Sequence, residues 1–179
     1  MHPDAVVVER CIWGISHNDA DALEILYEQV SAAVYAYALS ITKNTYDAKD
    51  VLHDCIVKVY ESADTYTPCG KPMAWILTIA KNLCYSKFRQ NSRFAEMTDE
   101  EIERQFADDE RMTSDDKMVV TQCLSCLSAD ERNIVVLHAL SGLKHKEIAK
   151  ITNLPLPTVI SKYNRALKKM QNIFAENGQ

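Results

Sequence analysis

The segment from 141 to 170 constrains the fold of this chain most, because its apolar residues recur at helical spacing in two blocks around a turn. The first block spans 143–151, and the turn follows at 153–155. The second block begins near Pro157, where proline is tolerated because first-turn amides lack intrahelical partners. Its apolar face is formed by Val159, Tyr163, Ala166, Leu167, Met170 and Phe174. The pattern predicts a helix-turn-helix, a shape that reads DNA.

Positive charge gathers in this segment, although the formal net charge of the whole chain is -5. Within the segment only Glu147 opposes the lysines and the arginine. The second helix is predicted to place its polar residues on one outward face, and Lys144 belongs to the same basic segment. These candidates for DNA contact are Lys144, Thr158, Ser161, Lys162, Arg165, Lys168 and Lys169. Clustered lysine and arginine side chains bind nucleic acid by displacing counterions from its phosphates. The alternative is a basic helix face that contacts only solvent.

The composition favours an all-α protein. Only four glycines and five prolines occur among 179 residues, and hardly any segment alternates between apolar and polar residues. No apolar run approaches the ~20 residues that cross a bilayer. The N-terminus lacks a basic leader followed by a long apolar stretch, so we expect a cytoplasmic protein without membrane insertion.

The six cysteines do not predict a metal site or a disulfide framework. Cys55 and Cys84 lie on apolar helix faces, where a thiol packs as a small hydrophobe. Cys123 and Cys126 form a lone CxxC pair without the further ligands of a structural zinc site. An enzyme built on this pair, with His138 nearby, would lack a base, a pocket and a phosphate loop. We expect no cofactor, no metal and no catalytic activity.

The N-terminal half is predicted to form three amphipathic helices. The first begins at a cap near Asp19 and ends at 43–45. The second carries a polar and acidic outward face with Asp50, His53 and Asp54. After the turn-rich segment 65–72 comes the third, whose predicted buried residues are Trp75, Ile76, Ile79, Ala80 and Leu83. Its predicted outward residues are Lys81, Asn82, Lys87 and Arg89.

A composition change divides the chain. Between about 91 and 116 carboxylates outnumber basic residues and apolar residues are sparse, which indicates a flexible acidic linker. A helix through 119–127 opens the second lobe. The next helix starts at Ser128, whose spacing to Glu131 fits a capping box, and this helix ends at Gly142. We therefore predict an N-terminal domain over 1–90, a linker over 91–116 and a helix-turn-helix domain over 117–179.

At this level of detail the chain resembles the extracytoplasmic-function group of the sigma-70 family of RNA polymerase sigma factors. One resemblance is the segment PMAWILTIAKNLCYSKFR, which is similar to the family pattern W-[IL]-x-x-I-A-[RK]-N-x-x-x-D-x-x-R. A second is the segment ALEILYEQVSAAVYAYALSITKNTYDAKDVLHDCIVKVYESADTY, which resembles the opening conserved region of the family. A third is the final lobe, from LSADERNIVVLHALSGLKHKEIAKI through TVISKYNRALKKM. Each motif is weak alone, but their order and spacing are specific. Ser86 and His53 depart from the family, which commonly has Asp and Gln there.

The resemblance implies roles for the first lobe. Asp50, His53 and Asp54 would dock on the clamp coiled coil of core RNA polymerase. The loop from Tyr66 to Pro72 would capture a base flipped out of the minus-ten element, a step whose unstacking cost needs a compensating pocket. Residues expected to stack or to hold the opened strand are Tyr66, Lys71, Lys81, Asn82 and Arg89. Trp75 is assigned to the core.

For the second lobe, the resemblance implies that the helix near Pro157 enters the major groove of the minus-thirty-five element. Thr158, Ser161, Lys162 and Arg165 would be foremost, and Lys168 and Lys169 would grip phosphates. Ile160, at a position often basic in relatives, is expected to contact a thymine methyl. The acidic linker would thread toward the RNA exit path of the polymerase, or act only as a solubilising tether.

The function expected from the resemblance is that of a sigma factor. Such a protein binds core RNA polymerase, recognises the minus-thirty-five and minus-ten elements of promoter DNA and assists melting. Relatives usually have an anti-sigma factor as an inhibitory partner. The alternative is a free-standing helix-turn-helix regulator that binds duplex DNA without polymerase. That alternative leaves the Asp50 helix and the Tyr66 to Pro72 loop without a role.

Overall fold

The described part of the chain, residues 3–91 and 126–177 of a computed structural model, forms seven α-helices and one 3-10 helix and contains no strand. This confirms the prediction of an all-α protein. The elements are α1 (Ala5–Ser16), α2 (Ala20–Thr42), α3 (Thr45–Ser62), η1 (Ala63–Thr65), α4 (Pro72–Asn91), α7 (Ala129–Ser141), α8 (His145–Thr152) and α9 (Leu156–Asn177). None of these described helices is long and apolar enough to span a membrane.

The helix boundaries read from capping residues are confirmed. Asp19 caps α2 by accepting the N–H of Asp21 at 3.1 Å, and α2 ends at Lys43 with a left-handed φ of 53°. In α7 the backbone N–H of Ser128 donates to Glu131 Oε2 at 3.0 Å, while the N–H of Glu131 donates to Ser128 Oγ at 3.4 Å. This reciprocal capping box satisfies two of the donors that a helix start leaves free.

One helix was not predicted. Asp4 caps α1 by accepting the N–H groups of Val6 and Val7, and the helix buries Val8 and Ile12 against the rest of the first lobe. The sequence signal is weak there because consecutive valines have restricted χ1 angles and lower helix propensity. Tertiary packing therefore decides this helix, which contacts α2, η1 and α4.

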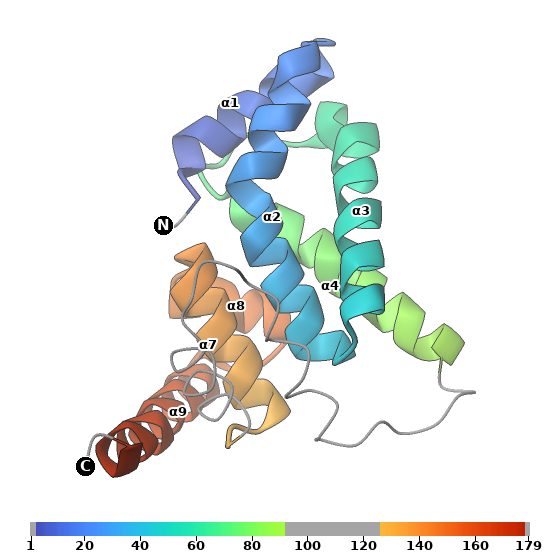
Figure 1. Cartoon of the computed structure of the whole chain (residues 1–179). Coiled ribbons are helices and arrows are strands. Elements are labelled where there is room, and N and C mark those ends of the chain that lie inside the picture. The colour runs from blue at the N-terminus through green and yellow to red at the C-terminus, as the bar shows by residue number, and fades with distance from the viewer. Residues whose placement is uncertain (1–2, 92–125, 178–179) are drawn as a thin grey trace.

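The two lobes pack against each other and share a hydrophobic core. Figure 1 shows α7 and α8 beside the lower part of α2, where α7 contacts α2, and α8 also contacts α4. One buried cluster includes Leu26 and Leu77 of the first lobe and Ile134 and Leu137 of the second. The predicted linker and residues 119–125 of the predicted helix over 119–127 lie outside the described residues, whereas Cys126 and Leu127 form a turn and a bend instead of helix. The domain limits remain a prediction.

Polar contacts also join the lobes. Ser40 on α2 is 3% exposed, and its hydroxyl donates to Asn133 Oδ1 on α7 at 2.8 Å. The same hydroxyl lies 2.7 Å from the Tyr37 carbonyl in its own helix. A buried hydroxyl needs partners, because burial without a hydrogen bond is costly. This contact therefore favours one register of α7 on α2.

Candidate nucleic-acid and polymerase interfaces

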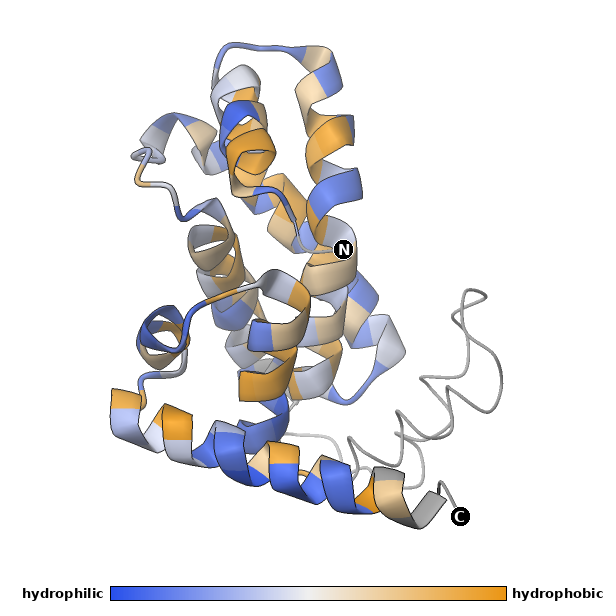
Figure 2. Cartoon of the chain, turned by 90° about the vertical axis from the view of Figure 1, so that its left-hand side faces the viewer, coloured by the Kyte–Doolittle hydropathy of each residue, from blue (hydrophilic) through white to orange (hydrophobic). Residues whose placement is uncertain are grey.

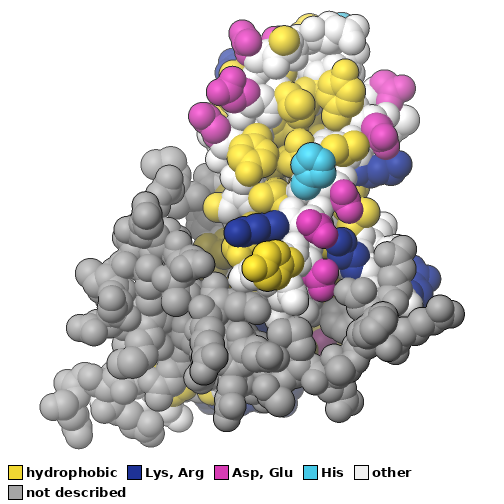
Figure 3. Space-filling model, turned by 45° about the vertical axis from the view of Figure 1, so that its right-hand side comes forward, with side chains coloured by type: hydrophobic (Ala, Val, Ile, Leu, Met, Phe, Trp, Pro, Cys, Tyr) yellow, Lys and Arg dark blue, Asp and Glu magenta, His cyan; other side chains and the backbone are white. Residues whose placement is uncertain are grey.

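The outward face of α3 combines acidic and apolar side chains, as Figure 3 shows for this side of the molecule. The predicted polymerase-binding residues Asp50, His53 and Asp54 are all exposed on it. Asp50 forms an ion pair with Lys87 on α4 at 2.8 Å, and the hydrogen bond from this lysine lowers the pKa of Asp50. The structure therefore brings these three predicted residues together on one accessible surface.

Sequence reasoning missed the apolar part of this face. Tyr46, Val57 and Tyr60 follow the same outward stripe, and their exposed fractions are 79%, 42% and 55%. Their spacing to Asp50 and His53 is that of one helix face, so the signal was present in the sequence. Large exposed apolar side chains beside carboxylates are typical of a protein-binding surface.

The loop 66–71, between η1 and α4, contains two of the predicted strand-binding residues. Tyr66 is half-buried, and its ring centroid lies 4.9 Å from that of Trp75. Residues 67–71 are exposed, and Gly70 has a φ of +68°, which favours glycine. Lys71 is exposed too, but its ammonium lies 3.2 Å from Glu147 of α8 in the other lobe.

The face of α4 that follows the loop carries the other predicted strand-binding residues. Asn82 and Arg89 are exposed, and Lys81 is half-buried with its ammonium 5.8 Å from the centroid of the Tyr85 ring. Tyr85 is 50% exposed and was not among the predicted residues. Proteins that bind single-stranded nucleic acid combine exposed aromatic rings, on which bases stack, with cationic and polar side chains. The third predicted helix thus has a more complete polar face than expected.

The buried side of α4 differs in detail from the prediction. Ile76 and Ala80 are fully buried, whereas Trp75, Ile79 and Leu83 are only partly buried. Leu77 and Cys84, by contrast, have no exposed surface. Trp75 packs at the edge of the core, as predicted, and its ring also contacts Tyr66 of the loop.

The outward face of α9 is the candidate DNA-reading surface. Figure 2 shows α9 lying along the edge of the molecule, hydrophilic over much of its length and apolar near its N-terminal end. An open groove of about 610 Å³ lies along this face, and its described lining residues are Leu156, Pro157, Ile160, Ser161, Asn164, Arg165 and Lys168. Three predicted residues, Ser161, Arg165 and Lys168, thus share one surface. Thr158 is half-buried at its edge.

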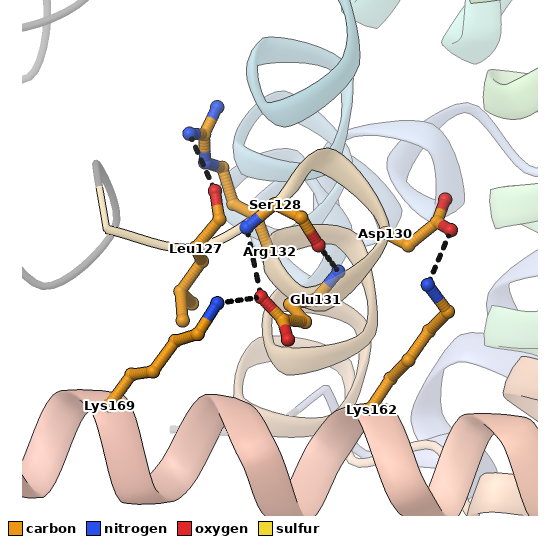
Figure 4. A network of polar contacts seen from close by, with 7 residues as sticks. All are labelled: Leu127, Ser128, Asp130, Glu131, Arg132, Lys162 and Lys169. Carbon is orange, nitrogen blue, oxygen red and sulfur yellow. Dashed lines mark hydrogen bonds and ion pairs between the residues drawn. The ribbon is translucent and has the colours of Figure 1, made fainter.

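The structure pairs the predicted DNA contacts Lys162 and Lys169 with carboxylates of α7, although Lys169 is exposed and Lys162 is half-buried. Lys162 forms an ion pair with Asp130 at 2.9 Å, and Lys169 forms one with Glu131 at 2.7 Å (Figure 4). Both lysines stand at the border of the stripe formed by Val159 and Ala166, which are buried. The periodicity of α9 alone could not predict these ion pairs, because the carboxylates of Asp130 and Glu131 belong to another helix, α7.

Glu131 is the centre of this network. Its side chain is 5% exposed, and burial alone would favour the neutral acid. Hydrogen bonds from Lys169 and from the N–H of Ser128 outweigh burial and lower the pKa of Glu131 to about 2. Arg132 beside it is buried and donates to the carbonyl of Leu127 at 3.3 Å. The network fixes the start of α7 against the middle of α9.

Two histidines pack against α9. The rings of His138 and His145 stack with centroids 5.0 Å apart, and both rings contact Tyr163 of α9. His138 Nδ1 lies 2.8 Å from the carbonyl of Leu143. Burial, and then the neighbouring His138, lower the pKa of His145. The cluster therefore joins α7, α8 and α9 through ring contacts.

The remaining predicted residue, Lys144, is exposed at the cap of α8. Its backbone N–H donates to Glu147 Oε2 at 3.0 Å. Within the residues that the structure describes, no group of three or more His, Cys, Asp or Glu side chains is arranged to hold a metal. Cys126 lies in this part of the chain, whereas Cys123 lies outside it.

Two family models match the chain. Sigma-70 region 2 matches residues 26–94, and Sigma-70, region 4 matches residues 117–170, so that together they cover more than half of the chain. The first match includes α3, the loop 66–71 and α4, and the second includes most of the helix-turn-helix lobe.

Curated relatives and solved structures agree with these matches. The ECF RNA polymerase sigma factor SigL of Mycobacterium tuberculosis is 24% identical over 92% of this chain and 96% of its own length. EcfG of Rhodopseudomonas palustris, another ECF RNA polymerase sigma factor, is 26% identical over 86% of this chain and 87% of its own length.

Among solved structures, the sigma factor RpoE from Bartonella quintana, in complex with the anti-sigma factor NepR, is similar in fold. Its TM-score is 0.65 at 24% identity, with 83% of this chain and 94% of that chain covered. CnrH, in complex with the cytosolic domain of CnrY, has a TM-score of 0.63 at 21% identity and covers 97% of this chain. With both conserved regions matched in order and the expected fold present, the chain belongs to the sigma-70 family, as one of its extracytoplasmic-function RNA polymerase sigma factors.

Proposed function

We propose that this sigma factor works through three separate surfaces, each formed by residues described above. The outward face of α3 docks on core RNA polymerase, the loop 66–71 with the polar face of α4 holds the opened minus-ten strand, and the outward face of α9 reads the minus-thirty-five element. The protein supplies specificity and catalyses no reaction itself. Its place of action is then the cytoplasm, where polymerase and promoter DNA are.

The observation that carries this proposal is that the exposed faces of α3 and α9 differ in charge: the first is acidic and the second is basic. The α3 face is acidic with exposed tyrosines, as a protein partner with basic residues requires. The α9 groove combines Arg165 and Lys168 with the exposed apolar side chain of Ile160. Arginine suits bidentate contact with guanine, and an apolar side chain suits a thymine methyl. A free-standing regulator would use only the second of these surfaces.

The ion pairs at α9 refine the set of proposed DNA contacts. Ser161, Arg165 and Lys168 remain on the outward face, with Lys144 exposed at the start of α8. Lys162 and Lys169 are assigned instead to holding α9 on α7, because both ammonium groups are already paired with carboxylates. In the first lobe Tyr85 joins Asn82 and Arg89 as a proposed contact to the opened strand.

An anti-sigma factor is a proposed further partner. One similar solved structure is the sigma factor RpoE in complex with the anti-sigma factor NepR, and the other is CnrH in complex with the cytosolic domain of CnrY. This likeness in fold supports the proposal of an inhibitory protein partner. We assign no residue of this chain to the contact.

In-vitro transcription with core polymerase on a promoter library tests the proposal. The unmodified chain should select templates that share two short elements at a fixed spacing. Asp54→Lys should prevent assembly with core polymerase by placing a like charge on the docking face, and Arg165→Ala should relax the upstream element only. Tight protection of duplex DNA by the chain alone, without any comigration with core polymerase, would refute the sigma assignment of these surfaces.

A further inference from the structure

A single carboxylate of α1 holds the loop 66–71. Glu9 Oε1 accepts the hydroxyl of Tyr66 at 2.9 Å, the N–H of Cys69 at 3.1 Å and the N–H of Gly70 at 3.0 Å. Two of the three donors are adjacent backbone amides, an arrangement that forms a small anion-binding concavity. The carboxylate that fills it comes from a residue 57 to 61 positions earlier in the chain. Glu9 precedes the segment 26–94 that matches region 2.

The loop depends on this contact because it has little packing of its own. Residues 67–71 are exposed, and a Cβ placed on Gly70 would meet nothing within 4 Å. At its two ends the loop is tied to η1 by the N–H of Tyr66 and to α4 by the carbonyl of Lys71. Between those ends, Glu9 connects Tyr66 and the Gly70 turn to α1, whose inner face is buried against the core. The hydrogen bonds from Gly70 and Tyr66 lower the pKa of Glu9, so the carboxylate is charged at neutral pH.

Charge-assisted hydrogen bonds are shorter and about twice as strong as neutral ones. Three of them on one oxygen fix Tyr66, Cys69 and Gly70 relative to α1 before any DNA is present. A pocket that is already shaped avoids the entropy cost of ordering a loop when it binds. For a base leaving the duplex this matters, since extrusion itself costs a few kcal/mol.

We propose that Glu9 is a positioning residue for capture of the extruded minus-ten base, acting through the hydrogen bonds that shape the loop 66–71. This inference rests on the proposed role of that loop in binding the opened strand. Glu9 itself touches no base. It fixes the positions of Tyr66 and of the turn at Gly70. These positions determine the size of the proposed base site, and therefore which base the loop accepts.

The test uses holoenzyme assembled from core polymerase and the full chain, with single-stranded oligonucleotides that carry the selected minus-ten element or one base substitution at each position. Glu9→Ala should weaken binding of the selected oligonucleotide by about tenfold, and should reduce discrimination between the selected and the substituted bases by a similar factor. Glu9→Gln keeps an acceptor oxygen without the charge, so its losses should be intermediate. Tyr66→Phe, which removes one of the three donors, should lose less than Glu9→Ala.

Glu28→Gln is the matched control, because Glu28 is an exposed carboxylate on α2 and the change in net charge is the same. It should bind all oligonucleotides as the unmodified chain does. Thermal unfolding and binding of an upstream duplex are measured in parallel, and neither should change for Glu9→Gln. A merely structural role would lower the melting temperature without changing the ratio between bases.

Two negative results are distinguishable. If Lys71→Ala and Thr67→Ala leave strand binding unchanged, the loop itself does not bind the strand and the proposed function of this surface is wrong. If those loop variants impair strand binding while Glu9→Ala and Glu9→Gln keep full affinity and base preference, only the role of Glu9 is refuted.

Discussion

Lys71, at the end of the loop in the first lobe, forms an ion pair of 3.2 Å with Glu147 of α8 in the second lobe. The same lysine is a proposed contact to the opened DNA strand. We expect strand binding to compete with this ion pair, because the Glu147 carboxylate repels a phosphate that approaches the same ammonium. The pair therefore links the packing of the two lobes to the availability of the loop.

Replacement of this carboxylate should release the lysine. We expect Glu147→Gln to raise the affinity of the isolated chain for the single-stranded minus-ten oligonucleotide several-fold, roughly the effect of freeing one cation. Thermal stability should fall by less than about 1 kcal/mol, because a partly exposed ion pair contributes little and Gln still caps α8. Fluorescence anisotropy measures the affinity. Glu61→Gln, which removes the exposed partner of Lys58, is the control and should change neither quantity.

The shared core predicts that the lobes unfold together. Leu137 on α7 is fully buried, so Leu137→Ala should destabilise the protein by about 2 to 5 kcal/mol. Both tryptophans of the chain, Trp13 and Trp75, lie in the first lobe and report its unfolding by fluorescence. We expect this first-lobe signal to shift to lower denaturant concentration when Leu137 is truncated.

Leu140→Ala offers a matched comparison on the same helix, because Leu140 is 44% exposed. This change should stay within about 0.5 kcal/mol of the unmodified protein. An unaltered tryptophan transition in Leu137→Ala, with a second transition seen only by circular dichroism, would mean that the lobes are independent.

Lys168 and Lys169 are neighbours with different expected roles. Lys168→Ala should weaken duplex binding by holoenzyme on all sequences and reduce the slope of log K against log salt by about 1. Lys169→Ala should instead cost about 1 to 3 kcal/mol of folding free energy, because Glu131 would remain buried without its cation. Salt titrations of binding and chemical denaturation of both variants separate the two roles. The opposite assignment of effects would show that Lys169 faces the DNA.

The pH dependence of stability should reflect Glu131. Its pKa is lowered from 4.5 to about 2 in the folded protein, so the folded state binds fewer protons than the unfolded chain between these values. The contribution is therefore complete above about pH 5 and is lost as pH falls from 4.5 toward 2, and it amounts to roughly 3 kcal/mol. Urea denaturation at a series of pH values measures it.

Glu131→Gln should be less stable at neutral pH, and its stability should depend less on pH in this acid range. Glu61→Gln, at an exposed position on α3, should keep the pH dependence of the unmodified protein. Equal curves for Glu131→Gln and the unmodified chain would contradict the role of the Lys169 ion pair.

The sequence by itself determined the helical class, the boundaries of α2 and α7 and the helix-turn-helix, because caps and apolar periodicity are local signals. Asp19 and Ser128 each accept a hydrogen bond from an amide two or three residues away, so a short stretch of sequence is enough to predict these contacts. The acidic face of α3 was predictable for the same reason, since Asp50, His53 and Asp54 share one side of a regular helix.

Only the tertiary structure decided which polar side chains are free for a partner. Lys162 and Lys169 find carboxylates on α7, Lys71 finds one on α8, and the loop amides find Glu9 on a helix that local propensity did not predict. Each of these pairs joins residues far apart in the chain. Periodicity tells which side of its own helix a residue occupies, but the charge it meets there depends on how distant helices pack.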